Sequence, residues 1–407
     1  MKAGYLCNLL FINGIAKFNY ALHLLQTKQT IMKLLKPTLI LGVILFAFDA
    51  FSQNILIADN RPSRPLGAHV YIGLQEAIDA ATDGDIIHLM PSAINYGNVT
   101  VNKELTIYGI GFSPDKDGPQ KAWVDNMSLV DGASNTRVSG INISTALYIG
   151  NSIGANYSVS NVFVENSRIK RILRNTSYTV SFSNVVIRNC IIGWGYTSSA
   201  AVMELDNSGG YTLSNVLITN NIITPSTYGS GQYAALRVDD AIIKNNLFLG
   251  DNNLSTSANG WGITQSNSCT VSNNIFYGVR AYTGTVTNTT FNNNLSNLPA
   301  TDGGDGYFND FATGAGSGTT YSGNITATDP LFTNVGFVYG WDFAYDPTTS
   351  AAEVTSGGTD GTDIGLFGST IPFSMTGTPL PIIKTLIIPE IIKQGNNLNA
   401  DIEAVGN

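Results

Sequence analysis

The sequence predicts an all-β protein: a parallel β-helix, in which short strands stack coil upon coil, with a short capping helix before it. Two features of composition favour this fold class. Only 12% of the 407 residues are charged, against about 25% in ordinary soluble domains. Gly and Asn each number 42, and 24 of the asparagines lie between Asn151 and Asn297. Because Asn and Gly suit turns and disfavour helix interiors, a mainly helical middle is excluded.

The third feature is a degenerate repeat, in which a short strand, a polar residue, Asn and a second apolar pair recur six times. Its anchor asparagines are spaced 23, 31, 25, 28 and 20 residues apart: Asn166, Asn189, Asn220, Asn245, Asn273 and Asn293. A period in the twenties built from short strands is typical of a solenoid. Because coils stack at about 4.8 Å, we expect the anchor amides to form a structural ladder of hydrogen bonds. The alternative is a set of ordinary solvent turns with Asn in the left-handed conformation.

The capping helix is expected over residues 74–81, where apolar side chains at 74, 77, 78 and 81 have helical spacing. Short alternating strands follow at 86–89, 99–101 and 105–109. A solenoid needs such a cap because its end coil otherwise exposes apolar side chains and unpaired strand edges.

The N-terminal region predicts export. Residues 39–48 are continuously apolar but too short to span a bilayer. A basic stretch precedes them and a small-residue cleavage site follows, so residues 32–52 are predicted to be a signal peptide cut after Ser52. Residues 1–31 are then an upstream extension outside the mature protein. The alternative is a buried core helix. Export implies an extracellular, cell-surface or periplasmic location without a transmembrane span.

Two parts of the chain resemble a known family. The opening residues 74–87 and 99–109, and the later segments 329–332, 342–343 and 360–367, are similar to those of secreted right-handed parallel β-helix proteins, the pectate-lyase-like superfamily in the broad sense. At 349–352 the chain has Thr-Ser-Ala-Ala where that family usually has Ser-Pro-Ala. The resemblance implies a right-handed β-helix over about residues 53–368. It leaves the activity open, because this scaffold carries lyases, hydrolases, esterases and binding proteins.

The end of the chain has a different character. A Gly- and Thr-rich stretch at 301–328 predicts a loop excursion late in the β-helix. Residues 369–407 predict a Pro-containing linker and a short β segment. This segment is expected either to open an Ig-like module or to fold back against the final coil.

Charge, histidine and cysteine content exclude several functions. A net charge of −8 argues against nucleic-acid binding, which needs a dense basic face. Of the three histidines, only His69 and His88 follow the leader, and both precede the repeat, so a Ser-His-Asp triad on the coils is excluded. Cys190 and Cys269 lie too far apart along the coils for a disulfide, and we expect two buried thiols.

Two carbohydrate chemistries remain. A glycosidase needs paired carboxylates, and Asp239 with Asp240 is the obvious pair, although neighbours on a strand point to opposite faces. The tripeptide at 168–170 is similar to a substrate-binding tripeptide of polygalacturonases, but it precedes the aspartates and no Gly-His-Gly motif is present, so that assignment is rejected.

A lyase needs a base and a cation beside a uronate carboxylate. Candidate bases are Arg188, Arg237, Lys244 and Arg280, with carboxylates from Glu165, Glu204, Asp206, Asp239 or Asp240. Arg188 and Lys244 share the repeat position of Glu165, which predicts that they line one face. The alternative is that polar residues at this position simply face water.

Calcium is the one cofactor that the sequence suggests. Asp302 and Asp305, and separately Asp360 and Asp363, lie in Gly-rich loops with the carboxylate character of calcium sites. Neither loop has nonapeptide or EF-hand spacing, and such turns also form without a metal.

Aromatic residues near the turns give the best indication of a ligand, because sugar rings stack on aromatic faces. Trp194, Tyr196, Tyr233 and Trp261 are the leading candidates, with Tyr211, Tyr228, Phe276 and Tyr277 beside them. The alternative is that these rings pack in the core. The sequence therefore predicts a monomeric secreted or cell-surface protein that binds polysaccharide or a cell-surface glycan without catalysis. The alternative is a polysaccharide lyase or glycoside hydrolase that acts on an acidic polysaccharide.

Overall fold

The computed structural model describes residues 53–405, except 65–66, 113–120, 151–155, 175–178, 229–230, 233, 251–259, 284, 299–306, 309–310, 312–315, 338–340, 376, 378–381 and 388–400. The chain divides into two units, 1–53 and 54–407, and the second holds all the elements below. The predicted extension at 1–31 and signal peptide at 32–52 lie outside the described residues. Among the described helices, none has the length and apolarity that a bilayer crossing requires.

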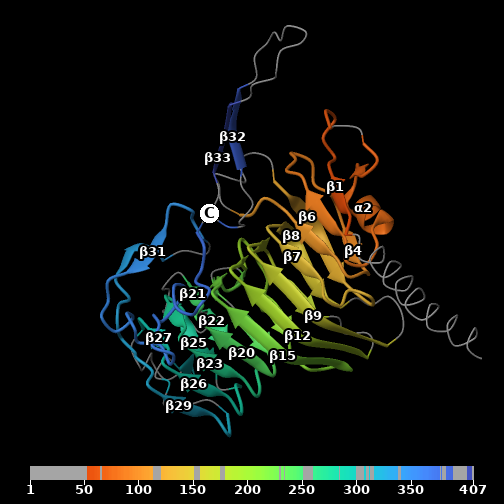
Figure 1. The fold of residues 1–407 in the computed structure, drawn as a ribbon. Helices are drawn as coiled ribbons and strands as arrows, with labels where there is room; N and C mark the ends of the chain where they lie inside the picture. Colours follow the sequence, from red (N-terminus) through yellow and green to blue (C-terminus); the bar gives the residue numbers. More distant parts are fainter. Residues whose placement is uncertain are drawn as a thin grey trace, which may run out of the picture. The chain divides into compact units, whose positions relative to one another are not determined.

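The first face of the solenoid is a twelve-stranded sheet whose neighbouring strands all pair in parallel. Strands far apart in sequence lie side by side, one from each coil (Figure 1). In sheet order they are β2 (Val70–Tyr71), β1 (Ile55–Ala58), β3 (Ile86–Leu89), β5 (Thr106–Tyr108), β7 (Arg137–Ser139), β9 (Tyr157–Glu165), β12 (Val180–Arg188), β15 (Tyr211–Thr219), β20 (Ala241–Lys244), β23 (Thr270–Ser272), β26 (Thr290–Asn292) and β29 (Thr320–Ser322).

A second sheet of fifteen strands supplies two further faces, which meet at the long strand β8 (Asn142–Ile149). The start of β8 pairs with β10 and its end pairs with β11. The second face continues from β10 (Arg168–Ile169) through β13 (Ile191–Ile192), β16 (Ile222–Ile223), β21 (Leu247–Leu249), β24 (Ile275–Tyr277) and β27 (Leu295–Ser296). The third face comprises β4 (Val99–Val101), the end of β6 (Trp123–Leu129), the end of β8, β11 (Ile172–Arg174), β14 (Met203–Leu205), β19 (Ala234–Val238), β22 (Trp261–Ile263), β25 (Arg280–Thr283) and β28 (Tyr307–Phe308).

Within these three faces only β28 pairs antiparallel, so the predicted all-β parallel β-helix is confirmed for the described part of the chain. Among the described residues, three short pairs of antiparallel strands lie outside the faces. They are formed by β17 (Thr227–Tyr228) with β18 (Gly231–Gln232), β30 (Phe332–Asn334) with β31 (Asp346–Thr349), and β32 (Ile382–Ile387) with β33 (Asp401–Val405). The last hairpin lies in the predicted C-terminal β segment, and its relation to an Ig-like module stays a prediction.

The predicted capping helix is confirmed as α2 (Leu74–Ala80), which contacts the first strands of the solenoid. Leu74, Ala77 and Ile78 are buried and form its apolar side. At its C-terminal end, Nζ of Lys103 donates hydrogen bonds to the carbonyl oxygens of Ile78, Asp79 and Ala81 at 2.8–2.9 Å. The lysine thus satisfies carbonyls that have no partner within the helix.

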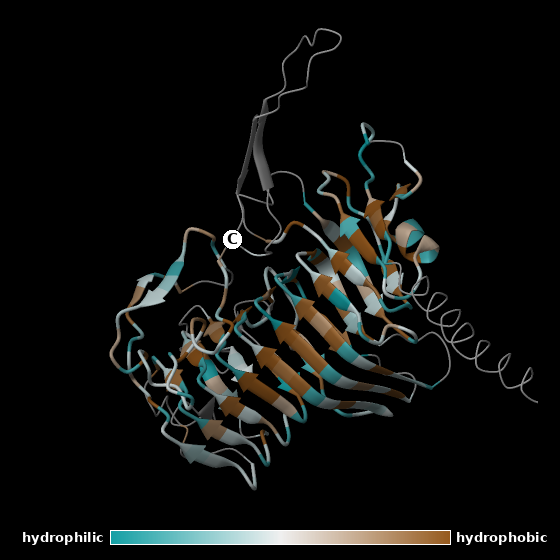
Figure 2. Ribbon diagram, in the orientation of Figure 1, coloured by the Kyte–Doolittle hydropathy of each residue, from teal (hydrophilic) through white to brown (hydrophobic). Residues whose placement is uncertain are grey.

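The core is built from columns of apolar side chains that repeat from coil to coil. One column on the first face joins residues in register that are all fully buried: Val138, Val164, Ile187, Ile218, Ile243, Val271 and Phe291. Figure 2 shows apolar residues concentrated on the strands and polar residues around the turns. Because alternate residues of a strand point to opposite faces, each coil contributes to the same continuous core.

Two columns of residues with positive φ bracket the first face. At its closing corner, the six anchor asparagines have φ between 51° and 58°. At its opening corner, which falls inside β9, β12 and β15 and just before the other strands, lie Asn135, Asn161, Asn184, Asn215, Asp240, Ser268 and Asn288, with φ between 46° and 62°. Asn and Asp tolerate this left-handed conformation better than other residues with a Cβ. The sharp corners therefore explain why Asn recurs at these positions.

The predicted ladder through the six anchors is wrong in its position, because the buried ladder runs one residue later. Nδ2 of each asparagine donates to Oδ1 of the next at 2.9–3.0 Å, in the order Asn221, Asn246, Asn274, Asn294 and Asn324. In the anchor column, only Asn189 donates to Asn166. The left-handed corner directs most anchor amides outward, while the next residue points between the coils, where its polar atoms need partners.

The structure adds repeat copies at both ends of the anchor column. Gly140 and Gly323 follow β7 and β29 with φ of 75° and 65°, in register with the anchors. Because Gly adopts this conformation without steric cost, it can replace Asn at these two corners, and the Asn repeat in the sequence therefore does not mark them. The loop excursion predicted over 301–328 is therefore wrong in part, because β29 belongs to the first face and Asn324 ends the ladder.

The anchor column holds the chain's return segment, residues 351–374. Nδ2 of Asn220 donates to the carbonyl oxygens of Leu366 and Gly368 at 2.8 and 2.9 Å. Nδ2 of Asn245 and Nδ2 of Asn293 make similar bonds to carbonyl oxygens of residues 357–365. Oδ1 of Asn273 accepts from the main-chain N of Thr359. Apolar side chains of the segment pack on the outer side of the second face, in a cluster that includes Ile222, Leu247, Ile275, Ile364 and Leu366. The second face is thus buried on both sides, which explains why both residues are apolar in the pairs Ile191-Ile192, Ile222-Ile223 and Leu247-Phe248.

Cys190 and Cys269 are buried and unpaired, as their predicted separation along the coils requires. Burial raises the pKa of each thiol to about 12.

Candidate functional site: a polar groove on the third face

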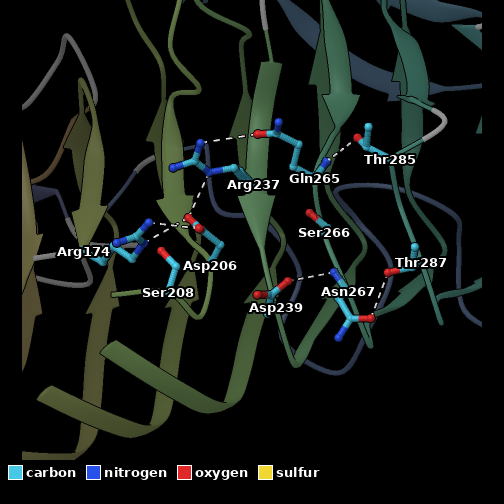
Figure 3. Close-up of a pocket in the computed structure, with 10 residues that line it drawn as sticks. All are labelled: Arg174, Asp206, Ser208, Arg237, Asp239, Gln265, Ser266, Asn267, Thr285 and Thr287. Atoms are coloured by element: carbon cyan, nitrogen blue, oxygen red, sulfur yellow. Dashed lines mark hydrogen bonds and ion pairs between the residues drawn. The ribbon is translucent and has the colours of Figure 1, made fainter. Parts of the chain in front are cut away.

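The third face carries an open groove formed by two adjoining hollows of about 630 and 440 Å³. Arg237 and Gln265 line both hollows, and the two hollows therefore form one continuous site. The larger hollow is drawn in Figure 3 and is lined by Arg174, Asp206, Ser208, Arg237, Asp239, Gln265, Ser266, Asn267, Thr285 and Thr287. The smaller hollow adds Ser199, Ala200, Ala201, Glu204, Ala234, Trp261 and Thr264.

Successive strands of the third face position these side chains. In β14, Glu204 lies between the buried residues Met203 and Leu205, and it therefore points outward. Arg237 has the same relation to its neighbours in β19, and the register places it directly beside Glu204. The outer surface of adjacent coils thus brings charged residues together that lie about thirty positions apart in the sequence.

Three arginines and two carboxylates form a network along the groove. Nη2 of Arg171 lies 2.9 Å from Oε1 of Glu204. Arg174 binds both carboxylate oxygens of Asp206 at 3.0 Å. Nε of Arg237 donates to Asp206 at 2.9 Å, and its Nη2 lies 3.4 Å from Glu204. Each guanidinium of this network has at least one carboxylate partner.

The network controls the protonation of Asp206. Burial acts to raise the pKa of this carboxyl group, but the hydrogen bonds and positive charges of Arg174 and Arg237 outweigh burial and hold the pKa below its usual value. Asp206 is therefore an ionised carboxylate at neutral pH.

Asp239 is shifted in the opposite direction. Burial raises its pKa, and the negative charges of Asp206 and Asp240 add to the rise. The main-chain N–H groups of Asn207 and Asn267 donate to its two oxygens at 2.8 Å and act against this shift. Asp206 and Asp239 thus form a pair of carboxyl groups in one groove whose pKa values are shifted in opposite directions.

The pair Asp239 and Asp240 does not converge on one site. Asp239 lines the groove, whereas Asp240 lies at the left-handed corner, where Oδ2 accepts a hydrogen bond from Nδ2 of Asn207 at 2.7 Å. The side chains of Asp239 and Asp240 therefore point in different directions, as expected for neighbouring residues at the end of a strand.

None of the remaining candidate bases lines the groove. Arg188 and Lys244 occupy one column of the first face with Glu165, as their repeat positions indicate. Oε2 of Glu165 accepts from Arg188 at 2.7–2.8 Å, and Oε1 accepts from Arg137 at 2.6 Å. Arg280 is 1% exposed in the third face.

The aromatic candidates divide between groove and core. Trp261 is partly exposed and lines the smaller hollow. The guanidinium carbon of Arg171 lies 5.0 Å from the ring centroid of Tyr196. The guanidinium carbon of Arg168 lies 3.7 Å from the ring centroid of Trp194. Tyr211, Phe276 and Tyr277 are buried, so for these three rings the alternative of packing in the core is confirmed. The side chains of Tyr228 and Tyr233 lie outside the described residues.

Of the two loops suggested as calcium sites, only the one with Asp360 and Asp363 lies among the described residues. Asp302 and Asp305 lie outside the described residues. Oδ1 of Asp360 accepts from N and Oγ1 of Thr362, and Oδ1 of Asp363 accepts from the main-chain N of Ser356. Both carboxylates thus stabilise turns of the return segment. Among the described residues, no group of three or more His, Cys, Asp or Glu side chains is arranged to hold a metal ion.

Most of the polar residues that complete the groove were not singled out from the sequence. Arg174, Gln265 and Asn267 belong to third-face segments separated by turns of variable length, so no fixed spacing aligns them. The available signal was a charged residue that follows an apolar strand residue, as in Leu173-Arg174 and Leu205-Asp206.

Fold and groove together define the class: a parallel β-helix protein with a polar groove across several coils of one face. No family model matches the chain, and no curated protein matches it.

Proposed function

We propose that the protein is exported and binds polysaccharide or a cell-surface glycan in the groove of the third face. The observation that carries this proposal is the lining itself: hydroxyls, amides, paired charges and the partly exposed Trp261 surround an open site that extends over several coils. Such polar groups bind sugar hydroxyls, and an open groove accommodates a polymer better than a closed pocket does.

Export rests on the predicted signal peptide at residues 32–52. Sequencing the N-terminus of secreted protein tests it, with cleavage after Ser52 as the expected result. A mature N-terminus upstream of Met32 would contradict this part of the proposal.

A second candidate function is glycoside hydrolysis, and the opposite pKa shifts of Asp206 and Asp239 favour it. In such an enzyme one carboxyl group donates a proton to the glycosidic oxygen while an ionised carboxylate acts on the sugar or on water. Asp239 suits the first role and Asp206 the second. A lyase is less favoured, because each arginine of the groove network is already paired with a carboxylate.

Two measurements on the same samples separate binding from catalysis. Native gels containing neutral or acidic polysaccharides report binding as retarded migration, while assays for reducing ends and for absorbance of unsaturated products at 235 nm report cleavage. We expect retardation without product. Product formation that is lost in Asp239→Asn but retained in Asp240→Asn would establish the hydrolase instead. Absence of retardation by every polysaccharide would contradict glycan binding in either form.

A further inference from the structure

We propose that the groove of the third face selects uncharged polysaccharides over polyuronates, an inference that rests on the proposed glycan-binding function. The argument begins with the charges. Arg174 and Arg237 contribute two positive charges to the lining of the groove, and Glu204, Asp206 and Asp239 contribute three acidic groups. The lining therefore has no excess of positive charge with which to attract a polyanion.

The guanidinium groups are also engaged. Arg237 contacts Asp206 and Glu204 and donates from Nη1 to Oε1 of Gln265 at 3.4 Å. The side chain of Arg174 is 7% exposed, and its Nε and Nη2 each donate to one oxygen of Asp206. Its Nη1 is buried and has no hydrogen-bond partner among the described residues. A uronate carboxylate that paired with Nε or Nη2 of either arginine would have to displace Asp206 or Glu204 and leave a partly buried charge unpaired, which is strongly unfavourable. A sugar hydroxyl has no such requirement, because it donates and accepts hydrogen bonds without separating the pairs.

The rest of the lining has the chemistry of hydroxyl recognition. Beyond Arg237 the groove continues over neutral residues of the next two coils: Gln265, Ser266, Asn267, Thr285 and Thr287. Oγ1 of Thr285 accepts from the main-chain N of Gln265 at 2.9 Å, and Oγ1 of Thr287 donates to Oδ1 of Asn267 at 2.9 Å. These bonds fix the side chains in position before a ligand binds, which lowers the entropy cost of binding. Figure 3 shows them side by side in the segments that follow β22 and β25.

Trp261 supplies an apolar surface beside the polar residues. It lies in β22 and lines the smaller hollow together with Glu204, Arg237 and Gln265. A pyranose ring stacked on the indole would have its hydroxyls directed toward these three side chains. The strands β11, β14, β19, β22 and β25 repeat at about 4.8 Å, so the lining extends for roughly 19 Å along the axis, which suits a chain of several sugars.

The test compares matched polymers in native gels with the full chain. The probes are an uncharged β-glucan or mannan and, at equal mass, polygalacturonate or alginate, each run at low salt and at 0.5 M NaCl. We expect retardation by an uncharged polymer that salt leaves unchanged, because no net charge is involved. Trp261→Ala should weaken this binding about tenfold. The control variant is Arg188→Gln. Because Arg188 lies on the first face and is paired there with Glu165, this variant should bind as the wild type does.

The outcomes distinguish the inference from the function on which it rests. Salt-sensitive retardation by the polyuronates alone would overturn the selectivity and leave glycan binding intact. Retardation by no polymer would overturn both. Binding that Trp261→Ala leaves unchanged would show that the polymer does not use this groove. Circular dichroism of each variant checks that the fold is retained.

Discussion

Nδ2 of Asn221 donates a hydrogen bond of 3.0 Å to Oδ1 of Asn246, and both side chains are fully buried between adjacent coils. Oδ1 of Asn246 also accepts from the main-chain N of Asn221 at 3.0 Å, while its Nδ2 donates to the carbonyl oxygens of Ile218 and Lys244 at 2.9 Å. A single amide therefore satisfies main-chain and side-chain groups of two coils. This arrangement connects the repeat in the sequence to the stability of the stack.

Replacing Asn246 with Ala should lower the free energy of unfolding by about 3 kcal/mol, because several buried polar groups lose their partners at once. Chemical and thermal denaturation followed by circular dichroism measure the loss. The matched control is Asn184→Gly in the exposed column at the opening corner, where Nδ2 donates to Asn161 at 3.0 Å. Gly keeps the left-handed backbone, so the control should change stability by no more than about 0.5 kcal/mol. Equal losses in the two variants would contradict a special role for the buried ladder.

Replacing Asn220 with Gly should loosen the return segment without unfolding the coils. The left-handed corner is retained, but the two bonds from Nδ2 to Leu366 and Gly368 are lost. Each lost bond is worth about 1 kcal/mol, and 1 kcal/mol corresponds to about fivefold in an opening equilibrium. Hydrogen exchange of peptides from 363–374 should accelerate accordingly, while peptides from β12 keep the wild-type rate. Equal acceleration in both regions would indicate global destabilisation instead.

Asp206 predicts an acid-dependent contribution to stability. Its pKa is lowered in the folded protein by Arg174 and Arg237, so ionised Asp206 stabilises the fold above the unfolded value near 3.8. This contribution is lost as the pH falls through the folded pKa. Asp206→Asn removes the charge, and at pH 7 it should cost about 3 kcal/mol because Arg174 loses its carboxylate. The difference in Tm between wild type and variant should be greatest near neutral pH and narrow below pH 3.8. A difference that stays constant down to pH 2 would contradict this coupling.

The two buried thiols should be inert in the folded protein. Because burial raises the pKa of Cys190 and Cys269 to about 12, almost no reactive thiolate exists at pH 8. A thiol reagent followed by peptide mass spectrometry should leave both residues unlabelled in the native chain. Both should react after denaturation without a reductant. Rapid labelling of native Cys269 would show that its surroundings open readily.

The solenoid was predictable because its constraints are local and repeated. Every coil needs a strand, a sharp corner and another strand, and the corner requires a residue that accepts positive φ, so Asn166 and its equivalents mark it in the sequence. The same logic explains the omissions: Gly140 and Gly323 meet the conformational need as well as Asn does, yet they break the pattern. The ladder was misplaced by one residue because spacing identifies a repeated position but does not tell which of two adjacent asparagines points between the coils.

The groove was less predictable than the fold. Arg237 and Asp239 were among the candidates, but so were Arg188 and Lys244, which lie on another face. The turns between faces vary in length, so the sequence does not reveal which charged residues of different coils become neighbours. The ion pairs of Arg174 with Asp206 and of Arg237 with Glu204 join residues 32 and 33 positions apart, and only the register of β11, β14 and β19 brings them together.

The sequence by itself determined the class of fold, the capping helix, the repeated corners and the unpaired cysteines, because backbone conformation and apolar periodicity depend on nearby residues. Tertiary structure decided the position of the ladder, the course of the return segment and the composition of the groove. These depend on contacts between coils and on which side of each strand a residue faces. The shortage of charge in the sequence thus has a structural counterpart: amides join the coils in the interior, and the few charged residues of the third face meet as pairs in the groove.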